Sequence, residues 1–377
     1  MHFIEGPTGN DSGPVWRLDG RRWLFGAHAL PEGKGYTVNS KEFARILGVS
    51  QATVSRALNN SPLVTEETKN MVVQKAAEYG FELNSLARSL KTNRTGTIGI
   101  LFSQHFRGMA GTPMLAHFYD CLQRELIKYD YDIMLVYDYA PDKGVSVFER
   151  IIRKRKVDGL ITIRTTLGDR EMSLIKENNF PCVSMLMTRQ KQDALYSLHT
   201  DSEYGGRLAG RFLGAFPDFE MMYIGFDGEE IENNRRCRSF KRGLTERGRE
   251  LSPTNQLSCP MTFEAGYAVA ERLTRSLAKK KLALFVYNDL IALGMLNAFR
   301  EAGIRVPDQV QILGVDDIPL ASWIKPNLST LHVDVEEIIP DGCKLLRDLI
   351  ENRKIAKFKS SYKPRLLLRD TTLPFPD

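Results

Sequence analysis

Four side chains near residue 50 have the types that read the edges of DNA base pairs. Gln51, Ala52, Ser55 and Arg56 would lie on the open side of one short helix. Gln pairs with adenine edges, Arg pairs with guanine and Ala contacts the thymine methyl group, while Ser suits a phosphate. The alternative is a helical hairpin whose polar face is merely solvated. Small polar residues with one Arg, rather than Glu and Lys, favour the base-reading interpretation.

Two short helices must position these side chains. They would meet at Leu47-Gly-Val-Ser50, where Gly48 allows a tight turn and Val49 fills the core. Apolar residues recur at helical spacing from residue 36 to about residue 95. Residues 36–95 hold eight Lys or Arg and five Glu, a net charge of +3 that suits a phosphate backbone. The expected helix N-caps are Asn39 or Ser40, then Ser50, then Thr65.

After Gly96 the pattern changes to alternating strands and helices, which predicts parallel sheets with right-handed crossovers. So many units predict two lobes with a ligand cleft beyond the carboxyl ends of the strands. The expected strands are Thr97–Phe102, Ile133–Tyr137, Gly159–Ile163, Cys182–Leu186, Met222–Phe226, Leu282–Tyr287 and Gln311–Val315. The expected helices are Phe118–Lys128, Val145–Arg155, Gly205–Leu213, Arg236–Arg247, Phe263–Leu277 and Ile291–Ala302.

Composition excludes several classes of protein. The 377 residues are 42% hydrophobic and 26% charged, with a net charge of +6, which is typical of a folded chain of two or three domains. No apolar run approaches the ~20 residues of a membrane span. The five cysteines form no CxxC, and the six histidines lack metal-ligand spacing, so we expect no metal, no cofactor and a reduced, cytoplasmic setting. No phosphate-binding loop, dinucleotide fingerprint or nucleophile elbow is present, so no enzyme activity is expected.

Two basic runs and the first 35 residues receive plainer interpretations. The cations at 150–156 and 279–281 are read as solvated helix ends, where positive charge is favoured. Residues 1–35 form an atypical extension, in which Asp19-Gly20 could join two short strands. A small docking element is one interpretation of this extension, and a loosely ordered segment is the other.

The stretch Leu47-Gly-Val-Ser-Gln-Ala-Thr-Val-Ser-Arg-Ala-Leu-Asn59, with Phe43-Ala44 before it and Val64-Thr-Glu-Glu-Thr68 after it, resembles the headpiece of the lactose/galactose-repressor family of bacterial regulators. The resemblance implies a helix-turn-helix that reads a near-palindromic operator as a homodimer. It implies that Gln51 and Ala52 read bases and that Arg56 also contacts the operator. Thr53 and Ser55 would then touch phosphates, and Asn59 completes the set of expected DNA contacts.

Residues 81–91 resemble the hinge helix of that family, which folds when two subunits meet over DNA. By this resemblance Leu90 wedges into the minor groove and Ala87 packs against its partner. Arg88 and Lys91 would then neutralise the DNA backbone. The family usually has proline where this chain has Leu83, so entry to the hinge would be less rigid. The alternative is an ordinary linker helix with Leu90 packed on the core.

The rest of the chain resembles the family's two-lobed core, which shares its fold with periplasmic sugar-binding proteins. The implied architecture is α/β, with an all-α headpiece and hinge followed by two doubly wound parallel sheets. We expect an extension at 1–35, a headpiece at 36–82, a hinge at 83–95 and a core at 96–377. The first lobe would hold about 96–197 and 335–361, and the second about 198–333 and 362–377.

The resemblance also implies an effector site between the lobes. Asp289 and Arg236 match the family's ligand-binding carboxylate and arginine, and facing charges of this kind suit a sugar or sugar phosphate. The alternatives are a helix N-cap for Asp289 and a surface salt bridge for Arg236. Other expected contacts are Pro113, Met114, Leu186 and Met261.

The apolar Met261 and Leu186 leave open a less polar effector, such as a nucleobase or nucleoside acting as corepressor. The expected function is therefore an allosteric transcriptional regulator, most simply a repressor of carbohydrate-utilisation genes. A sugar receptor without DNA binding would use the same core, but it would predict a signal peptide and no headpiece.

Overall fold

The computed structural model describes residues 38–58, 61–81, 94–102, 113–137, 145–163, 167–186, 196–228, 230–275, 277, 280–355 and 357–376. The chain divides into two units, residues 1–84 and 85–377, and each is described by itself. The expected hairpin around Asp19-Gly20 and the expected hinge residues Ala87, Arg88, Leu90 and Lys91 lie outside the described residues, as does Asn59.

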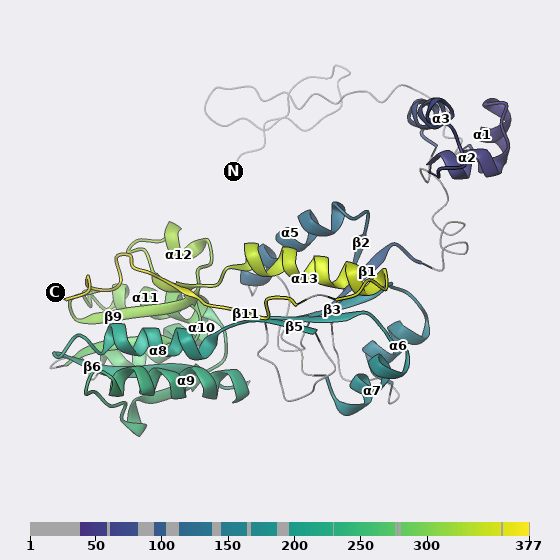
Figure 1. Cartoon of the computed structure of the whole chain (residues 1–377). Helices are drawn as coiled ribbons and strands as arrows, with labels where there is room; N and C mark the ends of the chain where they lie inside the picture. The colour runs from purple at the N-terminus through teal and green to yellow at the C-terminus, as the bar shows by residue number, and fades with distance from the viewer. Residues whose placement is uncertain are drawn as a thin grey trace, which may run out of the picture. The chain divides into compact units, whose positions relative to one another are not determined.

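The first unit contains a three-helix headpiece, in purple in Figure 1, made of α1 (Ser40–Ile46), α2 (Gln51–Leu58) and α3 (Glu66–Tyr79). The buried side chains Phe43, Val54 and Val72, one from each helix, form its core. The ring of Phe81 stacks on Phe43 with 4.0 Å between ring centroids. This packing of apolar faces holds together helices that are too short to be stable alone.

The helix ends of the headpiece follow the sequence signals. Asn39 caps α1 and Thr65 caps α3, while the Ser50 hydroxyl accepts the Thr53 amide at 3.0 Å. Gly48 has a φ of +66°, the left-handed conformation that glycine adopts without strain. The predicted caps and the predicted tight turn are therefore confirmed.

The second unit contains two six-stranded sheets among its described residues. The first sheet has the order β11-β5-β4-β3-β1-β2 and the second β12-β10-β9-β8-β6-β7. All pairings are parallel except β10 with β12. The strands of the first sheet are β1 (Thr97–Phe102), β2 (Asp132–Tyr137), β3 (Gly159–Ile163), β4 (Cys182–Met185), β5 (Tyr196–Thr200) and β11 (Ser361–Tyr362). Those of the second are β6 (Phe219–Phe226), β7 (Gln256–Cys259), β8 (Lys281–Val286), β9 (Val310–Asp316), β10 (Ser329–His332) and β12 (Arg365–Leu367).

Helices cover both faces of each sheet. In the first lobe α5 and α13 lie on one face and α6 and α7 on the other (Figure 1). The helices of the first lobe are α5 (Pro113–Ile127), α6 (Val147–Arg153), α7 (Asp169–Glu177) and α13 (Val335–Ile350). Those of the second are α8 (Ser202–Leu213), α9 (Glu230–Thr245), the 3-10 turn η3 (Pro253–Asn255), α10 (Phe263–Thr274), α11 (Asp289–Glu301) and the short α12 (Leu320–Trp323).

The two sheets share one doubly wound order, in which the third strand pairs with the first rather than with the second. The order reverses between β1 and β3 and again between β6 and β8, and ligands of such sheets bind beyond the carboxyl ends of the strands at this point. The seven predicted strands are all present, and so are the six predicted helices. Eight further elements were not predicted from the sequence: β5, β7, β10, β11, β12, α7, α12 and α13.

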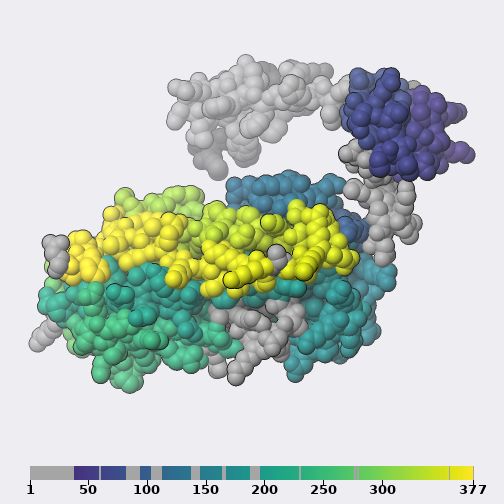
Figure 2. All heavy atoms as spheres, viewed as in Figure 1, coloured from purple at the N-terminus to yellow at the C-terminus, as the bar shows by residue number. Residues whose placement is uncertain are grey.

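The chain crosses between the lobes three times, after β5, after β10 and after β11. The C-terminal residues, yellow in Figure 2, therefore run over the surface of both lobes. The crossings after β5 and β11 lie against each other, since the Asp201 amide donates to the Tyr362 carbonyl at 2.7 Å. A Cβ on Gly205 would lie 2.9 Å from Pro364. Among the described residues, none of the helices combines the length and the apolar character that a membrane span needs.

Candidate nucleic-acid and effector sites

Helix α2 presents a polar face on the headpiece surface. Gln51, Ala52 and Arg56 are exposed, whereas Val54 and Ala57 face the core. Thr53 is half-buried, and its hydroxyl lies 2.8 Å from that of Ser50. Ser55 is also half-buried. The fold thus leaves the expected base-reading side chains accessible on one side of the helix, as docking in a major groove requires.

The corner after β8 brings together the two charged residues expected to contact an effector. Arg236 lies on α9, which follows β6, and its guanidinium donates to the backbone carbonyl of Tyr287. The same guanidinium lies 4.6 Å from the centroid of the Tyr287 ring. Asp289 begins α11 two residues later. Because β6 and β8 are the strands at which the order reverses, both residues lie at the carboxyl edge where ligands of this fold bind.

Neither alternative interpretation of these residues holds. The N-cap of α11 is Asn288, whose side chain accepts the Ile291 amide at 3.0 Å, so Asp289 is not the cap. Arg236 is only 7% exposed and bonds a backbone carbonyl, so it is not part of a surface salt bridge. Two buried charged side chains at one corner are unusual in a protein interior unless they serve a bonded or functional arrangement.

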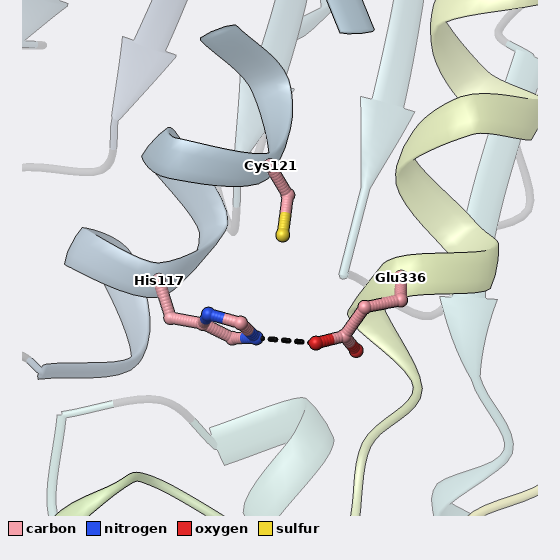
Figure 3. A group of neighbouring side chains, drawn as sticks. All are labelled: His117, Cys121 and Glu336. Carbon is pink, nitrogen blue, oxygen red and sulfur yellow. Dashed lines mark hydrogen bonds and ion pairs between the residues drawn. The ribbon is translucent and has the colours of Figure 1, made fainter. Parts of the chain in front are cut away.

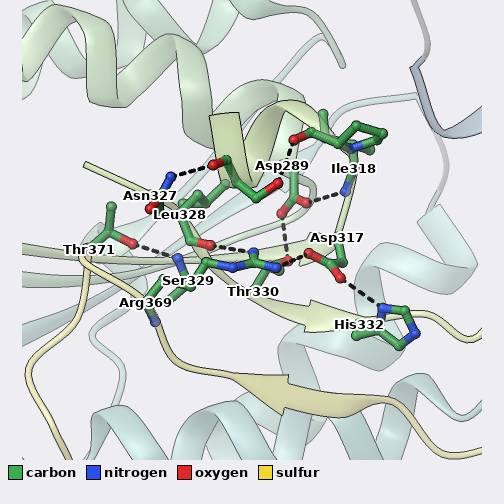
Figure 4. A network of polar contacts seen from close by, with 12 residues as sticks. Asp289, Asp317, Ile318, Asn327, Leu328, Ser329, Thr330, His332, Arg369 and Thr371 are labelled. Atoms are coloured by element: carbon green, nitrogen blue, oxygen red, sulfur yellow. Dashed lines mark hydrogen bonds and ion pairs between the residues drawn. The ribbon is translucent and has the colours of Figure 1, made fainter. Parts of the chain in front are cut away.

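The Asp289 carboxylate is fully buried and bonded on both oxygens (Figure 4). Oδ1 accepts from the Thr330 hydroxyl at 2.6 Å, and Oδ2 accepts from the Ile318 amide at 3.0 Å. Burial raises the pKa of Asp289 well above its ordinary value, and the nearby Asp316 acts in the same direction. The bonds from Thr330 and Ile318 oppose that rise. Asp289 therefore joins α11 to the turn after β9 and to β10.

The turn after β9 is held in a strained conformation beside Asp289. Asp316 and Asp317 have φ values of +115° and +61°, which side chains other than glycine rarely adopt. The Asp317 carboxylate accepts from Arg369 at 2.6 Å and pairs with Nδ1 of His332 at 2.9 Å (Figure 4). Burial raises the pKa of Asp317, but the bonds from His332 and Arg369 outweigh burial and leave the pKa lowered. This network was not predicted from the sequence.

The remaining expected effector contacts are less polar. Met114 and Leu186 are buried in the first-lobe core, and Pro113 begins α5. Leu186 follows β4 with a φ of +62°. Met261 follows β7 and is half-buried. The residues directly after β1, β2 and β3 lie outside the described ranges, so the first lobe contributes few described side chains to this edge.

A separate cavity of about 640 Å³ lies at the other end of the first lobe. Its lining includes Lys176, Phe180, Cys182 and Arg353. Cys182 is the first residue of β4, so this cavity opens at the amino ends of the strands. We do not assign the effector to it, because ligands of doubly wound sheets bind at the carboxyl ends.

Known proteins match both units of the chain. The family of bacterial regulatory proteins known as the lacI family matches residues 41–84, and a periplasmic binding protein-like domain matches residues 219–372. The chain therefore carries a lacI-family DNA-binding domain and a periplasmic binding protein-like domain. It is accordingly a DNA-binding transcriptional regulator, as predicted from the headpiece sequence.

Relatives and solved structures extend over nearly the whole chain. The HTH-type transcriptional repressor PurR of Vibrio parahaemolyticus is 26% identical over 332 residues, which cover 88% of this chain and 97% of the relative. PurR of Vibrio vulnificus is 28% identical over 335 residues, with the same two shares covered. The structure of the lac repressor dimer bound to operator and the anti-inducer ONPF has a TM-score of 0.73 at 21% identity, covering 90% of this chain and 100% of that one. The transcriptional regulator CelR in complex with cellobiose has a TM-score of 0.64 at 22% identity, with 88% and 99% covered. These structures show the same fold.

Proposed function

We propose that this regulator is a homodimeric repressor controlled by a small effector that binds at the Tyr287–Asp289 corner between the lobes. The observation that carries the proposal is the convergence of buried Arg236 and buried Asp289 on that corner, at the point where strand order reverses. A guanidinium offers donors and a carboxylate offers acceptors, so the corner suits a ligand with hydroxyl, phosphate or amide groups.

Sugars and sugar phosphates are the first effectors to test, because their hydroxyls both donate and accept hydrogen bonds. A nucleobase or nucleoside corepressor is the second candidate. The apolar Met261 and Leu186 support it, since flat rings pack on apolar side chains better than a polyhydroxy ring does. The similarity to PurR repressors is a further reason to test both classes together.

Calorimetric titration of the full-length protein with both classes of compound tests the effector site. Arg236→Met should lower the affinity for the active compound by about 10- to 100-fold, because a charge-assisted hydrogen bond contributes roughly 1.5–3 kcal/mol. Arg238→Met is the matched control, since Arg238 is exposed on the same helix. Equal loss of affinity in both variants, with both folded, would place the ligand elsewhere.

The dimer and the hinge are further parts of the proposal. In the family resemblance, Leu90 from each subunit wedges into the centre of the operator, with Ala87, Arg88 and Lys91 around it. Sedimentation with and without operator DNA should show two chains per duplex. Leu90→Ala should weaken operator binding while leaving dimerisation of the core intact. A wild-type protein that binds its operator as a single chain would contradict the proposal.

A further inference from the structure

A cluster of three metal-ligating side chains lies between α5 and α13 (Figure 3). His117 and Cys121 lie four residues apart on α5, so they share one helix face. Glu336 lies in the first turn of α13 and points toward them. The ligand atoms of the three residues all lie within 4.8 Å of one another, and Nε2 of His117 is 2.8 Å from Oε1 of Glu336.

The donor set is one that zinc favours. Zn²⁺ is bound by imidazole nitrogen, thiolate sulfur and carboxylate oxygen at about 2.0–2.3 Å, so three ligand atoms this close can surround one ion after small side-chain movements. Nη2 of Arg124 donates to Sγ of Cys121 at 3.1 Å, which orients the sulfur at this position. Cys121 is buried, while the side chains of His117 and Glu336 are partly exposed, which leaves an entry route for an ion.

Further ligands lie beside the three. His332, Asp334 and Glu336 form a second group whose ligand atoms also lie within 4.8 Å of one another, and Glu336 belongs to both groups. His332 already pairs through Nδ1 with Asp317, and this contact orients the ring as carboxylates that accept from metal-bound imidazoles do. A fourth ligand from His332 or Asp334, or a water molecule, would complete a tetrahedral site.

We propose that His117, Cys121 and Glu336 bind a zinc-class divalent ion that joins α5 to the start of α13. Binding would displace the Cys121 thiol proton to solvent. The site would hold the crossing from β10 to α13, which carries the chain from the second lobe into the first. The competing interpretation is a His117–Glu336 ion pair beside a buried cysteine. The site was not predicted from the sequence, because a His and a Cys four residues apart lie on the same side of the chain only when that chain is helical.

Metal titration of the full chain, with any purification tag removed and no DNA added, tests the site independently of the proposed function. Zn²⁺ affinity is measured by calorimetry, and Co²⁺ serves as a probe whose thiolate bond gives a charge-transfer absorption band. We expect one ion per chain and a Co²⁺ band that is lost in Cys121→Ser. In Cys121→Ser the Zn²⁺ affinity should also fall by more than about 100-fold. Replacing a residue that merely hydrogen-bonds to a metal ligand already lowers metal affinity by about 10- to 100-fold.

Two further variants keep the outcome clear. His117→Gln should also lower Zn²⁺ affinity, and it serves in place of Cys121→Ser should that variant fail to fold. Cys237→Ser, at a half-buried cysteine on α9, should bind both metals like the wild type. An excess of Mg²⁺, which prefers oxygen ligands, should not displace Zn²⁺. Absence of a Co²⁺ thiolate band in the wild type, or a band and affinity unchanged in folded Cys121→Ser, would overturn the proposal.

Discussion

The Thr330 hydroxyl on β10 donates a 2.6 Å hydrogen bond to Oδ1 of Asp289 at the start of α11. This bond joins the strand that leads out of the second lobe to the corner proposed to hold the effector. Thr330→Val keeps the shape of the side chain but leaves one buried carboxylate oxygen without this donor. We expect the free energy of unfolding to fall by about 1.5–3 kcal/mol, measured by urea denaturation. Thr245→Val, at an exposed site on α9, should change it little; an equally small effect at Thr330 would mean that the bond adds no stability.

A close approach of backbone to side chain adds a second constraint on Asp289. A Cβ on Gly314 of β9 would lie 2.2 Å from Oδ1 of Asp289, a distance that real atoms do not show. Gly314→Ala should therefore displace the carboxylate and lower the free energy of unfolding by about 1–3 kcal/mol. The affinity for the effector should fall as well. Gly303→Ala is the control, because a Cβ there meets no neighbouring atom and affects stability only through the positive φ of Gly303. Unchanged effector binding in a folded Gly314→Ala would show that Asp289 is not a ligand contact.

The protonation of Asp289 should make stability depend on pH. Burial raises the pKa of this carboxyl in the folded protein above its value in the unfolded chain, so the folded state binds the proton more tightly. Stability from this group is therefore full below the unfolded pKa and is lost as pH rises through the folded pKa. From pH 5 to 8, the wild type should lose stability relative to Asp289→Asn as pH rises.

Asp370 provides the control for that titration. The Asn327 amide and the Lys325 ammonium lower the pKa of Asp370, so its titration falls below pH 5. The difference in unfolding free energy between wild type and Asp370→Asn should thus stay constant over the same range, by urea denaturation at each pH. A difference for Asp289→Asn that is equally constant would contradict a raised pKa.

The headpiece could be predicted from sequence nearly completely. Its helix caps, its turn glycine and the spacing of its apolar residues are local signals, and each has in the structure the role that the sequence predicts. The buried strands of the core could also be predicted, because fully buried parallel strands are continuous apolar runs in the sequence. The missed strands β7, β10 and β11 are short and polar, so pairing with distant neighbours decides them rather than composition.

The site could be predicted only in part. Asp289 and Arg236 were identified by resemblance, but the partners that hold them are a distant hydroxyl, an amide and a backbone carbonyl, which carry no sequence signal. Helix α13 was not predicted although its apolar residues have helical spacing, because a proline such as Pro340 in the interior normally breaks or kinks a helix. Because α13 was not predicted, the cluster that Glu336 forms with His117 and Cys121 on α5 could not be predicted either.

Fluorescence anisotropy with a duplex selected by this protein from random DNA tests most directly whether α2 reads bases. Wild type, Arg56→Ala and Gln74→Ala should be compared at several salt concentrations; Gln74 is exposed on α3 and serves as the control. Arg56→Ala should weaken binding by about 10- to 100-fold, since a base contact contributes roughly 1–3 kcal/mol, while Gln74→Ala stays close to wild type. Binding by wild type should fall steeply with added salt. If folded Arg56→Ala binds the selected duplex as tightly as wild type does, α2 is not the helix that reads the operator.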